Sequence, residues 1–365
     1  MHEVIQMYKI KELAELYGIH TNVLRFYEKK GLLASRRLTN GYRVYGEDER
    51  AILQKILLYR AMNFSLADIR ELLSREKGNA QELYFQQLQL LNAHLHELTA
   101  VRDHISQELN AMLANTYEEQ QDQKEMQRLL QEINKNREWK DRWDFDSFAK
   151  VYDEVVHMPT AQGLPFYEAY DHVLDETAKH AQMHGGRVLD VGCGTGNLSE
   201  RLAAAGLSVE GVDQSLEMLI QAKKKLPDML LHQGTFLSLP FEKCSFDTIT
   251  ASYAFHHCDA QERLLAVREM KRVLRRQGCI VIADLMFEHA QDRMKYEQHC
   301  TPQQKAELED EYFTTVEELT HIFSEEGFIC TNYKVSDILW IFVADLSEED
   351  RAGSYTHLRA HETAA

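Results

Sequence analysis

One glycine-rich turn, with the apolar runs on either side of it, constrains the fold of this chain more than any other feature. The first run, Val188–Val191, leads into three glycines spaced G-x-G-x-G within 192–196, and a helix-favouring segment follows at 197–205. A second apolar run, Ser208–Asp213, comes next. Strands that alternate with helices pack as a parallel sheet covered by helices on both faces. The region 187–285 therefore predicts a doubly wound, Rossmann-like α/β domain.

The same turn indicates which kind of ligand this domain binds. Glycines let the backbone approach a ligand closely, but the spacing here is not the G-x-G-x-x-G of dinucleotide sites. Asp190 stands at the end of the first strand, where a carboxylate repels a pyrophosphate and attracts an ammonium group. Asp213 ends the next strand, where a carboxylate can accept both hydroxyls of a ribose. The pattern predicts a site for a nucleoside that also carries positive charge.

Further segments carry a resemblance to a known family. They are Phe148–Asp153, Gly234–Phe241, Ser245–Ser252 and Tyr253–His257. With the glycine turn they resemble the class I S-adenosylmethionine-dependent methyltransferases, in the branch that acts mostly on small molecules. The resemblance implies S-adenosylmethionine as cofactor and a small-molecule methyl acceptor. It implies these cofactor-binding residues: Asp190, Gly192, Gly194, Gly196, Asp213, Gln214, Thr235, Phe236 and Ser252. The family usually has aspartate at position 235, so the threonine weakens the expected bond to the adenine amino group.

The catalytic group is less defined by the sequence. His256 follows the fourth strand, close to where the transferred methyl group should point, and Tyr152 is placed to close over the cofactor. Asp284, at the end of the fifth strand, is another candidate base. The alternatives are a scaffold or capping role for His256 and His257 and core packing for Tyr152. Neighbouring positions on one turn rarely converge on one ion, so we expect no metal site.

The N-terminal segment has a different pattern. Two short helices are expected at 8–16 and 21–30, with a cap at Thr21 or Asn22 and a glycine after each helix. Asn40-Gly41 predicts a hairpin within 36–45, and two more helices follow at 47–62 and 65–74. These elements predict a winged helix-turn-helix.

This segment resembles the MerR family of transcription regulators, through Leu24–Glu28, Gly31–Leu33 and Asn40–Tyr45. The resemblance implies a dimer that binds double-stranded, pseudo-palindromic promoter DNA. Residues of the recognition helix and the wing are expected to contact DNA, although core packing is the alternative for Tyr27 and Tyr45. The predicted DNA-binding residues are Thr21, Arg25, Tyr27, Arg36, Arg37, Tyr42, Arg43 and Tyr45.

A long helix is expected after the head, because apolar residues recur at alternating steps of four and three between Tyr84 and Met112. Only Arg102 interrupts this heptad seam. The seam predicts an intermolecular coiled coil that makes the protein a homodimer, and the alternative is a helix packed on its own domain.

Charge separates the parts of the chain, whose formal net charge is −17. Residues 1–75 hold 13 Lys and Arg against 9 Asp and Glu, a net charge of +4, and the remainder carries −21. Only the head can therefore approach phosphate. We expect a head at 7–75, a dimer helix at 76–114, a polar helical linker at 115–142, a methyltransferase domain at 143–348 and a disordered tail at 349–365.

These expectations combine into two hypotheses. The first is a cytoplasmic transcription regulator that is also an active small-molecule methyltransferase, since no signal peptide or membrane span is evident. The second is a regulator whose methyltransferase-fold domain senses S-adenosylmethionine or a related ligand without turnover. DNA is a weak candidate for the methylated substrate, because the body is strongly acidic.

Overall fold

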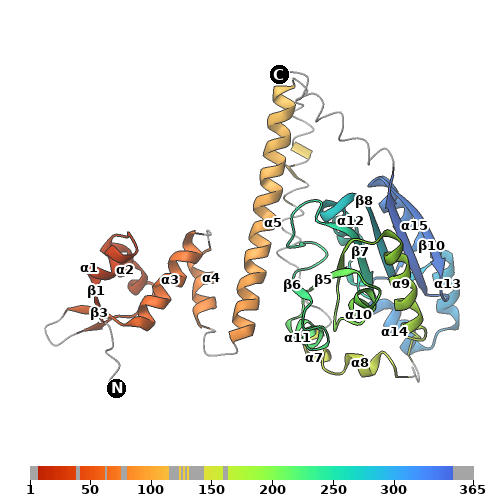
Figure 1. Cartoon of the computed structure of the whole chain (residues 1–365), viewed down its shortest axis with the longest axis horizontal. Helices are drawn as coiled ribbons and strands as arrows, with labels where there is room; N and C mark the ends of the chain where they lie inside the picture. The colour runs from red at the N-terminus through yellow and green to blue at the C-terminus, as the bar shows by residue number, and fades with distance from the viewer. Residues whose placement is uncertain are drawn as a thin grey trace. The chain divides into compact units, whose positions relative to one another are not determined.

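A computed structural model describes residues 7–37, 42–61, 64–74, 80–114, 144–158 and 163–347, and residues 123, 124, 126, 127 and 130. The chain divides into two compact units, Met1–Gln87 and Leu88–Ala365 (Figure 1). The predicted tail and most of the predicted linker lie outside the described residues.

The first unit holds the predicted helix-turn-helix and wing. Its elements are β1 (Tyr8–Lys9), α1 (Ile10–Leu16), α2 (Thr21–Lys29), β2 (Arg36–Arg37), β3 (Arg43–Tyr45), α3 (Glu47–Ala61), α4 (Leu66–Ser74) and the first turns of α5 (Ala80–Leu113). The three strands form one sheet in the order β1-β3-β2. Antiparallel pairing of Arg36 with Val44 confirms the hairpin, whose Asn40-Gly41 turn lies outside the described residues.

The cap of α2 differs from the prediction. His20, not Thr21 or Asn22, is the N-cap residue, and its Nδ1 accepts a hydrogen bond from the Asn22 backbone N–H at 3.2 Å. An imidazole nitrogen supplies the acceptor that a hydroxyl or carboxyl oxygen supplies at most N-caps.

The second unit is built on an eight-stranded mixed sheet. The order of seven strands is β10-β11-β8-β7-β4-β5-β6, and β9 pairs with β8. Their bounds are β4 (Arg187–Val191), β5 (Ser208–Asp213), β6 (Leu230–Gln233), β7 (Phe246–Ser252), β8 (Leu274–Phe287), β9 (Thr314–Thr315), β10 (Phe328–Lys334) and β11 (Leu339–Leu346). Strands β4 to β8 are parallel, and β10 and β11 are antiparallel. The apolar content of 328–345 predicts two closing strands, which β10 and β11 confirm.

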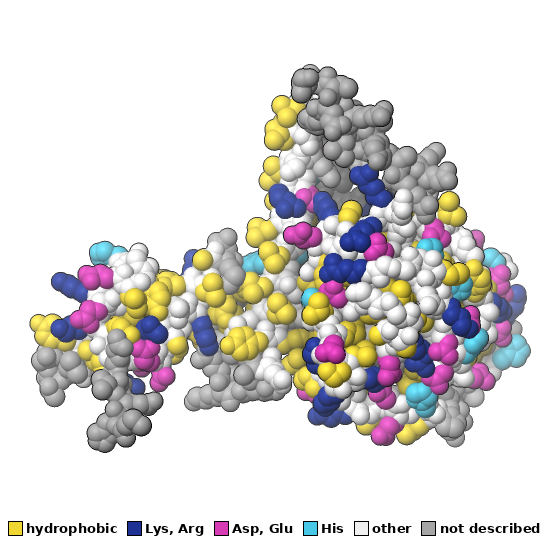
Figure 2. Space-filling view, in the orientation of Figure 1, with side chains coloured by type: hydrophobic (Ala, Val, Ile, Leu, Met, Phe, Trp, Pro, Cys, Tyr) yellow, Lys and Arg dark blue, Asp and Glu magenta, His cyan; other side chains and the backbone are white. Residues whose placement is uncertain are grey.

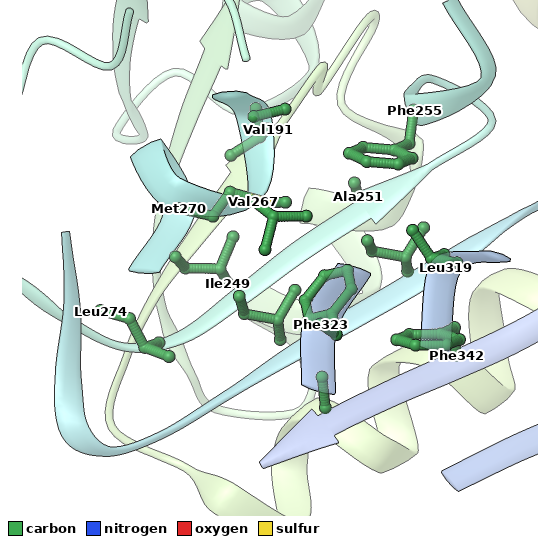
Figure 3. Close-up of a cluster of buried hydrophobic side chains, with 14 of the residues drawn as sticks. Val191, Ile249, Ala251, Phe255, Val267, Met270, Leu274, Leu319, Phe323 and Phe342 are labelled. Carbon is green, nitrogen blue, oxygen red and sulfur yellow. The ribbon is translucent and has the colours of Figure 1, made fainter. Parts of the chain in front are cut away.

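Helices cover both faces of this sheet. They are α7 (Phe145–Phe148), α8 (Tyr152–Val155), α9 (Tyr170–His184), α10 (Asn197–Ala204), α11 (Leu216–Lys225), the 3-10 turn η1 (Phe255–His257), α12 (Ala260–Val273), α13 (Ala290–His299), α14 (Pro302–Asp310) and α15 (Val316–Glu325). On one face, Met270 of α12 and Phe323 of α15 pack with Ile249 and Phe342 of the sheet (Figure 3). On the other, Val173 of α9 and Leu202 of α10 pack on the sheet. These two cores confirm the doubly wound architecture.

From its residues, the segment 288–311 is predicted to form one helical stretch, but the structure has two helices there, α13 and α14. Thr301 separates them, and its hydroxyl accepts a hydrogen bond from the Gln304 N–H at 3.2 Å. Pro302 then opens α14, because proline lacks the N–H that continuation of α13 would require.

Helix α5 keeps its heptad seam exposed. Leu95 and Leu98 are 60% and 59% exposed, and Ile105, Leu109 and Met112 are similarly open. Hydrophobic side chains are visible along this helix in Figure 2. Single exposed leucines are common on proteins, but a row at heptad spacing is typical of an interface between helices. Neither α5 nor any other helix among the described residues is both long enough and apolar enough to cross a bilayer.

Candidate cofactor and acceptor site

The glycine turn follows β4 directly and brings the backbone to the carboxyl end of the sheet. Gly192 and Gly194 have φ angles of 69° and 52°, which favour glycine. A Cβ on Gly192 would lie 2.5 Å from the Cβ of Ala254, so a side chain there would clash. A Cβ on Gly194 would meet no atom within 4 Å, because this glycine faces open space. The turn is thus tight on one side and open on the other.

Open space at this turn belongs to a cavity of about 350 Å³. The cavity lies where the strand order changes direction, since β5 is on one side of β4 and β7 on the other. Such switch points are where open α/β sheets bind ligands. The predicted residues Gly192, Gly194, Asp213, Gln214, Thr235, Phe236, Ser252, Tyr152 and His256 all line the cavity.

Asp213 links the end of β5 to the glycine turn. Its Oδ2 accepts a hydrogen bond from the Gly194 N–H at 2.8 Å, and its Oδ1 accepts one from the Ser215 N–H at 2.9 Å. The carboxylate is therefore oriented by the backbone of both segments while it lines the cavity.

Asp190 and Gly196 are in a different position, because neither lines the cavity. Asp190 is 1% exposed, and its carboxylate accepts hydrogen bonds from the hydroxyls of Ser199 (2.6 Å) and Thr250 (3.0 Å). Burial raises the pKa of Asp190 to about 7, against the effect of these two hydroxyls. Direct contact with a ligand in the cavity is thus not supported for this residue. Asp190 instead joins β4, β7 and α10 behind the turn.

The segment after β6 forms one edge of the cavity. Thr235 and Ser238 pair through their backbones, and the Thr235 hydroxyl accepts a hydrogen bond from the Leu237 N–H at 3.2 Å. The ring of Phe236 meets Phe255 edge to face, with centroids 5.5 Å apart. This edge offers a flat apolar surface beside a hydroxyl.

Tyrosine rings form another wall of the cavity. Tyr152, Tyr167, Tyr170 and Tyr253 all line the cavity, with ring centroids of neighbours 5.1 to 6.3 Å apart. Burial raises the pKa of Tyr152 well above its ordinary value, so its hydroxyl stays protonated at neutral pH. Only Tyr152 of this wall was predicted as a site residue, because the tyrosines at 167 and 170 carry no motif.

Asp153 connects this wall to the glycine turn. Its carboxylate accepts hydrogen bonds from Thr195 Oγ1 at 2.5 Å, Asn197 Nδ2 at 3.0 Å and Lys225 Nζ at 2.9 Å. Asp153 belongs to the motif Phe148–Asp153, but these partners are more than 40 residues away and had no signal in the sequence. Through Asp153, α8 is held against the turn.

Two histidines and one acid, Glu311, line the cavity together, and a buried acid, Asp284, contacts one of the histidines. His256 Nδ1 lies 2.5 Å from Asp284 Oδ1, and the His256 N–H donates to Asp284 Oδ2 at 3.0 Å. Burial disfavours the charged ring, but the Asp284 carboxylate outweighs that effect and raises the pKa of His256. Glu311, which follows α14, lies 3.4 Å from His257 Nδ1. Sequence reasoning missed Glu311 entirely, because only the fold brings it to η1.

The head's predicted DNA-binding residues divide into a group that is at least partly exposed and a pair of buried tyrosines. Arg36, Arg37 and Tyr42 are exposed on the wing, Arg25 is exposed on α2 and Thr21 begins that helix half-buried. Arg43 is partly exposed and pairs with Glu28 at 3.1 Å.

Tyr27 and Tyr45 require a correction. Tyr45 is fully buried, with its hydroxyl donating to Glu28 at 3.0 Å, and Tyr27 is 6% exposed. Both rings pack in the core of the head, which was the alternative left open by the sequence, so neither side chain is exposed for the predicted contact with DNA.

The sheet order, the glycine turn and the cavity at the switch point are those of the Rossmann-like methyltransferases. Family models agree with this class: residues 188–278 match the methyltransferase domain. Residues 8–76 match the MerR helix-turn-helix regulatory protein family, and residues 50–108 match the MerR DNA-binding model.

Individual relatives extend the match beyond the domain core. An uncharacterised methyltransferase of Bacillus pumilus is 36% identical over 209 residues, which cover 56% of this chain and 96% of the relative. One from Oceanobacillus iheyensis is 33% identical over 204 residues, 55% of this chain and 94% of the relative. A Thermotoga maritima structure, described as a possible histamine N-methyltransferase, has a TM-score of 0.42 at 20% identity, over 55% of this chain and 97% of that chain. The chain belongs to the methyltransferase family of the Bacillus pumilus and Oceanobacillus iheyensis proteins, with MerR-type DNA-binding domains at its N-terminus.

Proposed function

We propose that the protein is a dimeric transcription regulator whose body binds S-adenosylmethionine and methylates a small molecule. The observation that carries this proposal is one cavity bordered by the glycine turn, Asp213 and a tyrosine wall. The residues present fit the cofactor. Gly194 has open space where a side chain would otherwise intrude, Asp213 is an oriented carboxylate for ribose hydroxyls, and Phe236 is a flat surface for a base.

Bound S-adenosylmethionine would supply a methyl group already activated by a sulfonium. The protein's own task would then be mainly to orient the acceptor and exclude water, which can contribute about 7–11 kcal/mol. The tyrosine wall and α8 would enclose the cavity, with Asp153 holding α8 in place. His256, oriented by Asp284, is the best-placed group to accept a proton from an acceptor that must lose one.

The test combines binding with turnover. Titration calorimetry with S-adenosylmethionine should give binding to the dimer, and an assay for S-adenosylhomocysteine should detect product with some members of a panel of thiols, phenols and amines. Asp213→Ala should weaken both signals by about 10- to 100-fold. Absence of cofactor binding by the wild-type protein would refute the proposal.

A second function, ligand sensing without turnover, is favoured by contacts of α5 within the second unit. Asn92 Nδ2 donates to the backbone oxygen of Gln233 at 2.8 Å, directly before the segment that carries Thr235 and Phe236. His96 Nδ1 lies 3.7 Å from Glu269, whose carboxylate also accepts a hydrogen bond from the Leu239 N–H at 2.8 Å. The helix expected to form the dimer thus contacts the start of the segment at the edge of the cavity directly, and its other end through Glu269.

These contacts give the sensor its own test. Operator affinity should change when S-adenosylmethionine is added, because linkage makes the coupling between two sites reciprocal. The double variant Asn92→Ala/His96→Ala should lose this change while it still binds both cofactor and DNA. Glu97→Ala, one position along the same helix, is the matched control. Cofactor binding with no turnover over the whole panel, together with this coupling, would favour the sensor over the enzyme.

A further inference from the structure

Two histidines and one glutamate converge in the lining of the cavity, although they come from distant parts of the chain. His256 and His257 belong to η1, whereas Glu311 follows α14. One ligand-type atom from each of the three lies within 4.8 Å of the others. Glu311 Oε2 is 3.4 Å from His257 Nδ1 and 3.8 Å from His256 Nε2. Atoms bound at about 2.0–2.2 Å around a tetrahedral ion lie about 3.3–3.6 Å apart, so one of these two distances is within that range and the other is slightly longer.

Asp284 orients the ring of His256 as a metal ligand requires. Because His256 Nδ1 is engaged by Asp284 at 2.5 Å, the other ring nitrogen, Nε2, is directed toward Glu311. A carboxylate that holds the far nitrogen of a ligating histidine is a regular feature of protein metal sites, since it fixes the tautomer and the ring orientation. Asp284 is 1% exposed, so this orientation is well constrained.

Charge and burial also favour a bound cation at this cluster. His256 is 6% exposed, and the side chain of Glu311 is 19% exposed. Among the described residues, the ion pairs of Asp284 and Glu311 are made to these histidines. Glu311 Oε2 is buried and accepts no hydrogen bond of normal geometry within the part of the chain that the structure describes. Two carboxylates beside two imidazoles leave a surplus of negative charge, which is costly in a buried site unless a cation compensates it.

We infer that His256, His257 and Glu311 form a binding site for one divalent transition-metal ion, of the zinc type, oriented by Asp284. Two histidines and one carboxylate are a ligand set that zinc enzymes use when a fourth position is left for a substrate or water. All three residues line the cavity, so that fourth position would face it. The sequence predicted no metal site because only adjacent positions on one turn were available as ligands. Glu311 supplies a third ligand from a distant part of the chain.

The site would narrow the class of acceptor, a step that rests on the proposed methyltransferase function. A metal bound there would replace His256 as the group that favours the deprotonated form of a thiol or hydroxyl acceptor, because both ring nitrogens of His256 would then be engaged. An acceptor of that class would bind more tightly with metal present, whereas the affinity of a simple amine would increase less.

Metal binding can be tested without turnover, using Co²⁺ as a spectroscopic probe of the full-length, metal-stripped protein. We expect one Co²⁺ per chain with the visible absorption of a four-coordinate ion and no thiolate charge-transfer band, and Zn²⁺ should displace it. Glu311→Gln should weaken Zn²⁺ affinity at least tenfold. Asp284→Asn should weaken it by about 10- to 100-fold, the range seen when a residue that orients a ligand is changed.

A second cluster in the same domain provides the matched control. His184, Cys279 and Asp345 also lie within 4.8 Å of one another, but His184 is at the exposed end of α9. His184→Gln should leave Co²⁺ stoichiometry and affinity unchanged. Thermal unfolding and S-adenosylmethionine binding of each variant would show whether it is folded.

The outcomes separate this inference from the proposed function. Failure of folded wild-type protein to bind Co²⁺ or Zn²⁺, or equal binding by Glu311→Gln, would overturn the metal site and leave cofactor binding untouched. Metal binding without methyl transfer would retain the site and reject the enzymatic proposal. Loss of Co²⁺ in His184→Gln alone would assign the ion to the other cluster and overturn the inference.

Discussion

Asp213 and Gly194 are joined by a hydrogen bond of 2.8 Å from the Gly194 N–H to the Asp213 carboxylate, which ties the end of β5 to the glycine turn after β4. The two residues are 19 positions apart, and each lines the cavity. The acid thereby has a double role, because it holds the turn and presents a charge to the ligand.

Asp213→Ala is expected to weaken S-adenosylmethionine binding by about 10- to 100-fold, since hydrogen bonds to a charged group contribute about 1.5–3 kcal/mol. Titration calorimetry measures this, and Asp228→Asn, an exposed acid near the end of α11, is the control. Equal affinities of wild type and Asp213→Ala would show that the acid does not hold the cofactor.

Thr235 can be tested by restoring the residue that the family usually carries. Thr235→Asp is expected to tighten S-adenosylmethionine binding about fivefold, because a carboxylate makes a stronger hydrogen bond than a hydroxyl. Thr235→Val should weaken binding. An unchanged dissociation constant in both variants would mean that position 235 does not face the adenine amino group.

Asp190 makes stability depend on pH. Its pKa is raised to about 7 by burial, whereas an unfolded aspartate titrates near its ordinary value of 3.8. Between about pH 4 and 7 the folded state therefore binds a proton that the unfolded state has lost, and the free energy of unfolding falls as pH rises. Asp190→Asn removes this dependence.

The stabilising effect of Asp190→Asn should be larger at pH 8 than at pH 5, by about 2 kcal/mol. Urea unfolding monitored by circular dichroism at the two pH values measures it. Glu200→Gln, an exposed acid on α10, serves as control. The same difference at both pH values would show that Asp190 ionises normally.

The dimer is expected to depend on the exposed seam of α5. Leu95→Glu/Leu98→Glu should convert the dimer to a monomer, because like charges would replace apolar contacts worth about 1.5–3 kcal/mol each. Sedimentation velocity reports the change, and operator affinity should fall with it. Asn110→Asp, exposed on the same helix but off the seam, is the control. A monomeric wild-type protein would contradict the coiled coil.

Exposed arginines of the head should govern the salt dependence of DNA binding. Arg37→Ala is expected to weaken operator binding and to reduce the slope of log affinity against log salt by about 0.9 for each phosphate that is no longer neutralised. Fluorescence anisotropy across a salt series measures both quantities. Lys224→Ala, an exposed cation of the body, should change neither, and an unaltered slope for Arg37→Ala would exclude an interaction of this arginine with phosphate.

Periodic and local features account for what was predictable about the fold. The hairpin within 36–45, the alternation of strands and helices from 187 to 285 and the two closing strands all follow from patterns a few residues long, and the structure confirms them. The break at Thr301 was missed, because a capping hydroxyl before a proline is a weak signal inside a polar helical stretch.

The candidate site was only partly predictable. Motif residues at strand ends, such as Asp213 and Thr235, line the cavity as expected from their positions. Asp190 shares that strand-end position, but its carboxylate turns to Ser199 and Thr250, because the side chain on a strand faces one side of the sheet or the other and neighbouring hydroxyls offer it hydrogen bonds.

By itself, the sequence determined the two kinds of domain, the charge difference between them and the glycine turn, because each of these depends on residues that are close together along the chain. Only the tertiary structure decided which side chains meet. It buried Tyr45 against Glu28, brought Glu311 to His257 and attached Asp153 to the turn at Thr195. Such contacts join residues that are far apart along the chain, and their distances depend on how helices pack on the sheet rather than on any local pattern.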